Sequence, residues 1–163
     1  MVFGRIGGPY GWNIPFVNEV IDQILKQRSN YYFLFANTDR FTSHERVLFV
    51  ESFADLRTKR RFINTCDAMI HARNEGESFG AAVGEFSFCN KPVITFKGSP
   101  ERNHIITLGD KGIYYNNKED LHSVLHNFAP DTKKDWNAYK EFTPQAVMQQ
   151  FNNVFIENYK QCI

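Results

Sequence analysis

Two glutamates flanking a short glycine-containing segment are the residues with the clearest chemical potential in this sequence. Glu77 and Glu85 lie eight positions apart, and Ser78, Phe79 and Gly80 directly follow the first of them. These three residues are predicted to open a helix. Free backbone N–H groups at a helix start, together with the helix dipole, form an anion site suited to a diphosphate. Gly80 would let such a ligand approach the backbone closely.

The chemistry of the two carboxylates suggests what such a ligand carries at its ends. A carboxylate is a poor partner for phosphate but a good acceptor for paired hydroxyl groups. One carboxylate on each side of a phosphate site therefore suits a nucleoside diphosphate sugar, with ribose on one side and sugar on the other. The alternative interpretation is ordinary: Glu77 belongs to a first helical turn, and Glu85 is an exposed helix residue.

Strands and helices are predicted to alternate along the chain, which indicates a parallel sheet covered on both faces. Ligands of such sheets bind at the carboxyl ends of the strands, here the loops after Arg5, Ala36, His71 and Phe96. The expected fold is a Rossmann-like, three-layer α/β domain of about six strands. The strands are predicted over 1–5, 31–36, 47–50, 68–71, 92–96 and 112–115, and helices over 55–65, 79–89 and 119–128.

Further predictions concern three of the helices. The first helix is expected to be capped near Asn13, with Pro15 in its first turn and Val17, Val20, Ile21, Ile24 and Leu25 on its apolar face. In the 55–65 helix, Leu56, Phe62 and Ile63 are predicted to face inward. A C-terminal helix should begin at Thr143-Pro144. Its apolar stripe consists of Val147, Met148, Phe151, Val154, Phe155 and Tyr159. The stripe is expected to pack on the domain's own sheet, and the alternative is that the helix crosses toward a second domain.

Four features in order resemble one known family over roughly residues 1 to 128. They are Gly4-Arg5 at the end of the first strand, the spacing of Glu77 and Glu85, the Glu-Ser-Phe-Gly run that ends at Gly80, and the strand entry Lys91-Pro92-Val93. The chain resembles the C-terminal, donor-binding domain of family 4 retaining glycosyltransferases of GT-B fold. The resemblance implies transfer of a hexose-type sugar from a UDP or GDP donor to a glycan or other acceptor, without a metal or other cofactor.

The resemblance also assigns roles to individual residues. It implies that Arg5 neutralises the diphosphate, that Glu85 binds the ribose hydroxyls and that Glu77 holds hydroxyls of the donor sugar. The backbone amides of Phe79 and Gly80, beside Ser78, should contact phosphate or sugar. His71 and His104 fall at the expected ligand edge, and each is either a donor contact or a hydrogen-bonded structural histidine. Glu77 and His71 are the catalytic candidates.

The sequence departs from the family at the first loop, because residues 7–12 contain no Lys or Arg where the family usually has a Lys. Arg73, Lys97 and Arg102 are candidate substitutes, and Arg102 is favoured. Alternatively, Gly7, Gly8 and Gly11 could present their backbone N–H groups as an anion-binding nest.

The second departure is that a GT-B enzyme has two Rossmann-like halves, whereas residues 1–163 read as one donor-binding domain with C-terminal helices over about 132–163. The chain is therefore expected to be an excised domain, a truncated reading frame or the partner of a separate acceptor-binding domain or chain. It should bind nucleotide sugar but transfer it weakly or not at all. The alternative is a non-catalytic nucleotide-sugar or nucleotide-binding module. A dinucleotide-dependent oxidoreductase is disfavoured because the glycine fingerprint is missing.

Composition limits the remaining classes of function. A formal net charge of +1 gives no basic field for nucleic acid. Three widely spaced cysteines, Cys66, Cys89 and Cys162, favour free thiols in a reducing compartment. With neither a membrane-spanning apolar run nor a signal peptide evident, the expectation is a cytoplasmic protein without an integral membrane segment. His122 and His126 have a zinc-compatible spacing but lack a third ligand, so no metal site is predicted.

Overall fold

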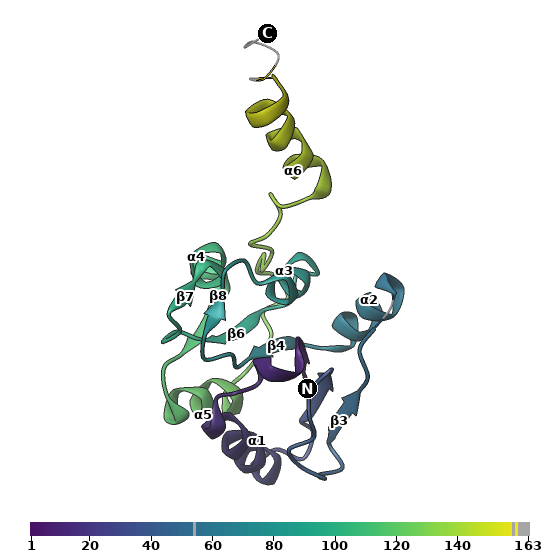
Figure 1. Cartoon of the computed structure of the whole chain (residues 1–163). Helices are drawn as coiled ribbons and strands as arrows, with labels where there is room; N and C mark the ends of the chain where they lie inside the picture. Colours follow the sequence, from purple (N-terminus) through teal and green to yellow (C-terminus); the bar gives the residue numbers. More distant parts are fainter. Residues whose placement is uncertain (54, 158, 160–163) are drawn as a thin grey trace.

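A computed structural model describes residues 1–53, 55–157 and 159 (Figure 1). The central sheet has six strands in the order β3-β2-β1-β4-β6-β8, and every neighbouring pair is parallel. This confirms the predicted Rossmann-like α/β fold. The strands are β1 (Val2–Ile6), β2 (Tyr32–Ala36), β3 (Val47–Val50), β4 (Ala68–His71), β6 (Val93–Phe96) and β8 (Gly112–Tyr115).

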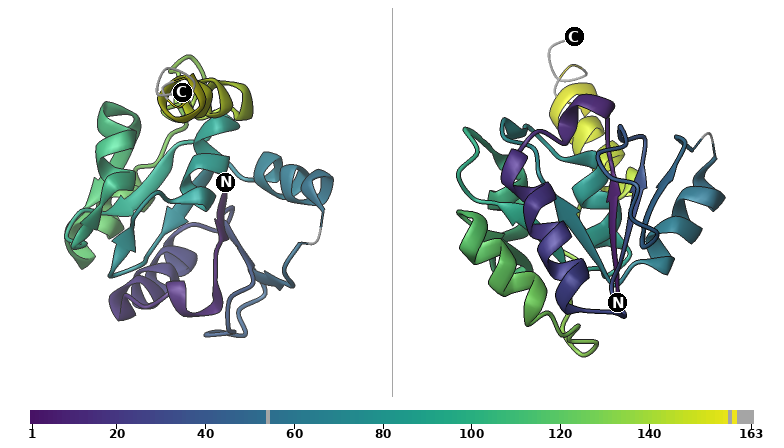
Figure 2. Two further views of the ribbon diagram at one scale, coloured as in Figure 1. Left: turned by 45° about the horizontal axis from the view of Figure 1, so that its top comes forward. Right: turned by 90° about the horizontal axis from the view of Figure 1, so that it is seen from below.

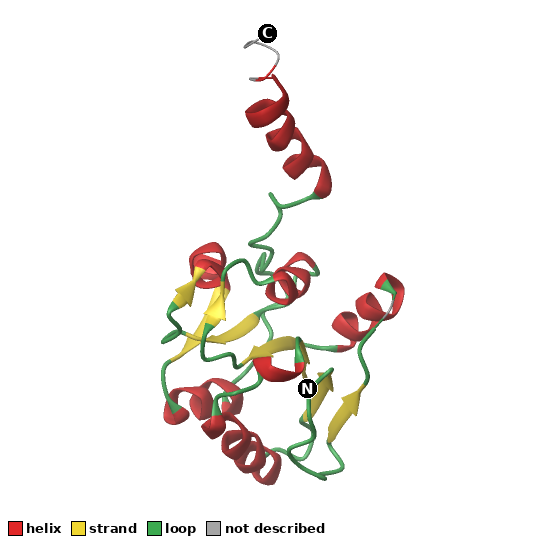
Figure 3. Cartoon of the chain, viewed as in Figure 1, coloured by secondary structure: helices red, strands yellow, loops and turns green. Residues whose placement is uncertain are grey.

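Helices cover both faces of the sheet, as Figures 2 and 3 show. Helices α1 (Pro15–Gln27) and α5 (Lys118–His126) share one face, and α2 (Leu56–Thr65) and α3 (Ala81–Phe88) lie on the other. Each face has its own apolar core, one including Ile21 and Leu125, the other Phe62 and Phe86. Two short 3-10 turns lie in the loops: η1 (Pro9–Gly11) connects β1 to α1, and η2 (Gly109–Lys111) precedes β8.

The apolar face of α1 is confirmed, because its five predicted residues are all buried. The helix start predicted near Asn13, with Pro15 in the first turn, is confirmed, but the N-cap residue is Ile14 and it makes no side-chain cap. Asn13 instead joins two loops. Its Oδ1 accepts a hydrogen bond from the backbone N of Asn74, and its Nδ2 donates to both carboxylate oxygens of Glu75.

A second, two-stranded parallel sheet was not predicted. It pairs β5 (Gly76–Glu77) with β7 (Glu101–Arg102), and the short helix α4 (Asn103–Leu108) follows directly. Gly76 has φ +79°, and a Cβ there would collide with the carbonyl oxygen of Glu101. Only glycine fits this position, because both the backbone conformation and the close approach of β7 exclude a side chain.

The C-terminal segment first crosses α3 and then leaves the body of the domain. Tyr139 is buried against α3, where a Cβ at Gly84 would lie 2.7 Å from its ring, and this contact explains a glycine inside a helix. Helix α6 (Pro144–Phe151) then begins at the predicted cap, Thr143, and continues into the π-helical segment η3 (Asn152–Ile156). Figure 1 shows α6 projecting away from the sheet.

Two predictions about burial are wrong. The stripe on α6 does not pack on the sheet: Met148 is 62% exposed and Phe155 60% exposed, because the segment before α6 leads away from the sheet. Leu56 is 80% exposed at the first position of α2, whereas Phe62 and Ile63 are buried as predicted. Cys162 lies outside the described residues, while Cys66 and Cys89 are free thiols.

Candidate functional site

The strand order places a topological switch point between the carboxyl ends of β1 and β4. From β1 the chain proceeds to β2 and β3 on one side, and from β4 it proceeds to β6 and β8 on the other. The connections leaving these adjacent strands therefore diverge, and ligands of doubly wound sheets bind at such a switch point. Arg5 lies at the end of β1 and His71 at the end of β4.

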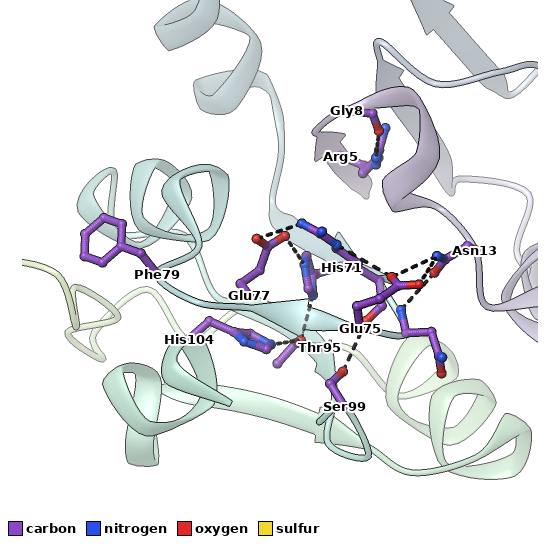
Figure 4. Close-up of polar contacts among 12 residues, drawn as sticks. Arg5, Gly8, Asn13, His71, Glu75, Glu77, Phe79, Thr95, Ser99 and His104 are labelled. Atoms are coloured by element: carbon purple, nitrogen blue, oxygen red, sulfur yellow. Dashed lines mark hydrogen bonds and ion pairs between the residues drawn. The ribbon is translucent and has the colours of Figure 1, made fainter. Parts of the chain in front are cut away.

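A buried polar cluster extends from this edge into the domain (Figure 4). Nε2 of His71 lies 3.3 Å from Oε1 of Glu77, and its Nδ1 lies 2.9 Å from Oγ1 of Thr95. The same Thr95 oxygen lies 3.2 Å from Nε2 of His104. His71 is 6% exposed, and Thr95 and His104 are fully buried. The cluster thus joins the loop that carries Glu77 to β4, β6 and α4.

The ionisation of the cluster follows from its surroundings. Burial raises the pKa of Glu77, but the hydrogen bond and charge of His71, together with the charge of Arg73, outweigh that effect and hold it below its usual value. Burial, reinforced by nearby His71, lowers the pKa of His104 to about 4. At neutral pH, Glu77 is therefore a carboxylate and His104 is neutral. Since a carboxylate only accepts hydrogen bonds, the facing Nε2 of His71 carries a proton.

Arg73 fixes the other oxygen of Glu77. Its NH1 donates to Oε2 of Glu77 over 3.1 Å, and its Nε lies 3.6 Å from Glu75. Glu75 in turn accepts the two hydrogen bonds from Asn13. Both Glu77 oxygens are therefore held, while a quarter of the side chain stays exposed. This arrangement leaves carboxylate lone pairs that can accept hydroxyl groups of a ligand.

Arg5, the predicted diphosphate ligand, lies beneath the first loop and is 3% exposed. Its NH2 donates to the carbonyl of Gly8 over 2.6 Å, and its NH1 donates to the carbonyl of Asn37 and the hydroxyl of Thr38. Burial lowers its pKa to about 10, although the charge of Glu77 opposes this. At neutral pH the guanidinium remains a cation at the carboxyl end of β1.

The predicted nest of glycine N–H groups does not form. Positive φ values among the described glycines occur at Gly76, Gly80 and Gly109, so Gly7, Gly8 and Gly11 lack the left-handed conformation that a nest uses. The N–H of Gly11 donates to Gly8 within the turn. Gly7 instead makes room for Arg5, because a Cβ there would lie 2.7 Å from its NH2.

The segment Ser78-Phe79-Gly80 leads into α3, as predicted, although the helix proper begins at Ala81 with Gly80 as the N-cap. Gly80 has φ +79°, and a Cβ there would lie 3.1 Å from the Cβ of His104. Phe79 is 46% exposed and points away from the cluster, where its ring meets those of Tyr139 and Phe142 (Figure 4). Exposed Ser78 accepts a hydrogen bond at its carbonyl from Asn103.

Glu85 lies on a different surface, a hollow of about 870 Å³ between α2, α3 and the C-terminal segment. Its Oε1 lies 2.8 Å from Nζ of Lys59 on α2, and Phe79 lines the same hollow. Glu77 and Glu85 are therefore on opposite sides of the turn into α3, with Glu77 facing His71 and Glu85 facing Lys59.

The other predicted residues are placed as follows. Arg102 pairs with Glu77 in the register of β5 and β7, but its exposed side chain donates to the carbonyl of Lys97. His104 lies behind Thr95 rather than at the surface.

Sequence reasoning missed Thr95, Lys59 and Asn13 as parts of this region. A hydroxyl at the end of the apolar 92–96 run was the available signal for Thr95.

Comparisons with known proteins identify similar proteins by structure only. No family model and no curated protein matches the sequence. The fold is similar to Anabaena HepE in complex with UDP-glucose, with 16% identity and a TM-score of 0.68 over 98% of this chain. It is also similar to a mutant of S. aureus TarM in complex with fondaparinux, α-GlcNAc-glycerol and UDP, with 13% identity and a TM-score of 0.70 over 94% of this chain. A third similar structure is WaaG, a glycosyltransferase involved in lipopolysaccharide biosynthesis, with 15% identity and a TM-score of 0.67 over 94% of this chain. The chain spans 48%, 35% and 46% of the length of these proteins.

Two further observations concern other kinds of site. The described part of the chain contains no group of three or more His, Cys, Asp or Glu residues arranged to hold a metal ion. Within the same residues, no helix is both long enough and apolar enough to cross a bilayer. His122 and His126 both contact Oε1 of Gln27 on the surface.

Proposed function

We propose that this chain is the donor-binding domain of a glycosyltransferase and that its ligand is a nucleoside diphosphate sugar. The observation that carries the proposal is the placement of two carboxylates on opposite sides of the turn into α3, with Glu77 beside His71 at the end of β4 and Glu85 beside Lys59 in the hollow. That turn supplies backbone N–H groups for a diphosphate, and the carboxylates supply acceptors for hydroxyls at both ends. Complexes of HepE and TarM with UDP or UDP-glucose support the same ligand class.

In the proposed binding mode, Glu85 accepts the ribose hydroxyls and Glu77 those of the donor sugar. The diphosphate lies at Phe79 and Gly80, with Arg5 and Arg73 as the cations that neutralise it. A positive potential there would stabilise the charge that develops on the nucleoside diphosphate leaving group. Arg102 remains a candidate third cation, because its position in β7 is opposite Glu77. On the basis of the motif resemblance, we further propose that the enzyme belongs to family 4. Its sugar transfer would then retain the anomeric configuration of the donor and use no metal.

Ligand binding is the direct test. Thermal unfolding of the 163-residue chain would be followed with UDP, GDP, UDP-glucose, a GDP-sugar and NAD. A ligand present at 100 times its Kd stabilises the folded state by ~2.7 kcal/mol, so a specific nucleotide sugar would stand out in the panel. Stabilisation by NAD alone, or by none of these compounds, would contradict the proposal.

A transfer assay separates an enzyme from a binding module. The chain spans about half of the length of HepE and WaaG. None of the residues assigned above is proposed to bind an acceptor. We expect the chain to bind donor and to release little or no nucleoside diphosphate in the presence of glycan acceptors. Robust transfer would show that this chain is sufficient by itself.

A further inference from the structure

The least expected feature of the site is a line of buried polar groups behind Glu77. Thr95 lies in β6 with its hydroxyl between two imidazoles, 2.9 Å from His71 Nδ1 and 3.2 Å from His104 Nε2 (Figure 4). The two rings are 5.1 Å apart between centroids, on β4 and α4. Burying three polar side chains costs free energy unless their hydrogen bonds are made, and apolar residues would fill the same space without that cost.

The number of protons in this line restricts how the rings can be oriented. Thr95 has one hydroxyl proton and can donate it to only one of the two rings, so the other ring must donate to Thr95. His71 simultaneously directs its protonated Nε2 to Glu77. Nδ1 of His104 is buried and makes no well-formed hydrogen bond, and the backbone carbonyl of Glu77 is the acceptor near it. His104 therefore contacts Thr95 through Nε2, and its Nδ1 lies near the backbone of the strand that carries Glu77.

Contacts with neighbouring residues hold His71 and His104 in place. The carbonyl of His71 accepts a hydrogen bond from the buried hydroxyl of Tyr115 over 2.9 Å. The Cβ of His104 lies close against Gly80, the N-cap of α3. The backbone at His71 and the entrance to α3 are thereby held in place, and the rotation of the His71 ring is set by its contacts with Thr95 on one side and Glu77 on the other.

We propose that Thr95 and His104 are positioning residues that orient His71, and through it hold the Glu77 carboxylate where a donor sugar's hydroxyls bind. Neither residue touches the sugar; each acts through the His71 ring. The proposal rests on the function proposed above, because Glu77 is the sugar-binding group in that scheme. It predicts an effect specific to the sugar, since in that scheme the ribose is bound by Glu85 on the other side of the turn and the diphosphate by the turn itself.

The first measurement compares the affinities of UDP-glucose and UDP for each variant by titration calorimetry. We expect Thr95→Val to lower the ratio of UDP-glucose affinity to UDP affinity about fivefold, the usual consequence of losing one buried hydrogen bond. Thr95→Ser, which keeps the hydroxyl, should restore the wild-type ratio. A Thr95→Val protein with an unchanged ratio would overturn the proposal.

The second measurement reads the His71 ring directly in the protein labelled with ¹⁵N-histidine, without ligand. Thr95→Val should shift the imidazole nitrogen resonances of His71 away from their wild-type positions, and Thr95→Ser should not. Resonances unchanged in Thr95→Val would show that another group orients the ring. This arm is independent of the donor: if wild type binds neither UDP nor UDP-glucose, the proposed function fails, and the spectra alone decide the role of Thr95.

A matched control loses a buried hydroxyl elsewhere. Ser87 on α3 is fully buried, donates to the carbonyl of Trp136 and accepts from the N–H of Ala138. Ser87→Ala should lower thermal stability without changing the affinity ratio or the His71 resonances. If it changes the ratio as much as Thr95→Val does, the effect reflects general destabilisation and the positioning role is wrong.

Discussion

Nζ of Lys59 on α2 lies 2.8 Å from Oε1 of Glu85 on α3, so the carboxylate proposed to bind ribose is already paired with a cation from another helix. Both side chains are about one-third exposed and line the same hollow. A partly exposed pair contributes little to stability, because water screens it. Its clearest effect is on position, since Lys59 directs Glu85 toward the hollow.

Removing the Glu85 carboxylate tests the ribose assignment. Glu85→Gln should weaken UDP binding about tenfold, because hydrogen bonds to charged groups are worth ~1.5–3 kcal/mol. Lys59→Met should weaken it by only a few fold, through lost orientation. Titration calorimetry measures both, with Lys26→Met on the opposite face of the sheet as the control. UDP binding of wild-type strength in Glu85→Gln would show that the ribose lies elsewhere.

Glu77 should matter for the sugar rather than the nucleotide. Glu77→Gln is expected to reduce UDP-glucose affinity about tenfold while leaving UDP affinity nearly unchanged, since the lost group is a charged hydrogen-bond acceptor. Glu75→Gln is a matched control two residues away, because Glu75 contacts Asn13 and Arg73 whereas Glu77 contacts His71. Equal losses for UDP and UDP-glucose would place Glu77 at the diphosphate instead.

Stability should fall as pH decreases from about 6.5 to 4 because of His104. Its pKa in the folded protein is lowered to about 4 from an ordinary 6.5, so in this interval the unfolded state binds the extra proton and is favoured. The full loss is of the order of 3 kcal/mol. Urea unfolding across this range should show a flatter profile for His104→Asn than for wild type. His122→Asn, at a half-buried histidine of α5 outside this cluster, is the control variant.

Two methionines test the placement of α6. Met148→Ala should change the free energy of unfolding by less than ~0.5 kcal/mol, because the side chain is 62% exposed. Met69→Ala, at a fully buried position of β4, should cost ~2–5 kcal/mol. Urea denaturation gives both values. Comparable losses in the two variants would mean that α6 packs on the domain after all.

Gly76 provides a test of the strand that carries Glu77. Gly76→Ala introduces a Cβ that collides with the Glu101 carbonyl at a residue with φ +79°, so the β5–β7 pairing must shift. The left-handed backbone alone costs ~1–2 kcal/mol for a residue with a side chain. The variant should unfold at lower temperature and lose sugar-dependent binding. Gly8→Ala, where a Cβ meets nothing within 4 Å, is expected to stay close to wild type.

The sequence by itself determined the six strands of the parallel sheet and their alternation with helices. Buried parallel strands have near-continuous apolar runs, and the apolar face of α1 repeats at helical spacing, so both can be predicted locally. The turn into α3 was also visible, because Gly80 ends a short polar loop before an apolar helix.

Only the tertiary structure decided which groups meet. The Thr95 hydroxyl ends an apolar strand, and nothing in the local pattern reveals that His71 and His104 approach it from two other elements. The pairing of β5 with β7 joins two-residue strands that are too short to show a periodicity. Met148 and its neighbours have the spacing of a buried helix face, yet the segment before α6 carries them away from the sheet. Periodicity depends on neighbours in sequence, whereas these contacts depend on how distant elements pack.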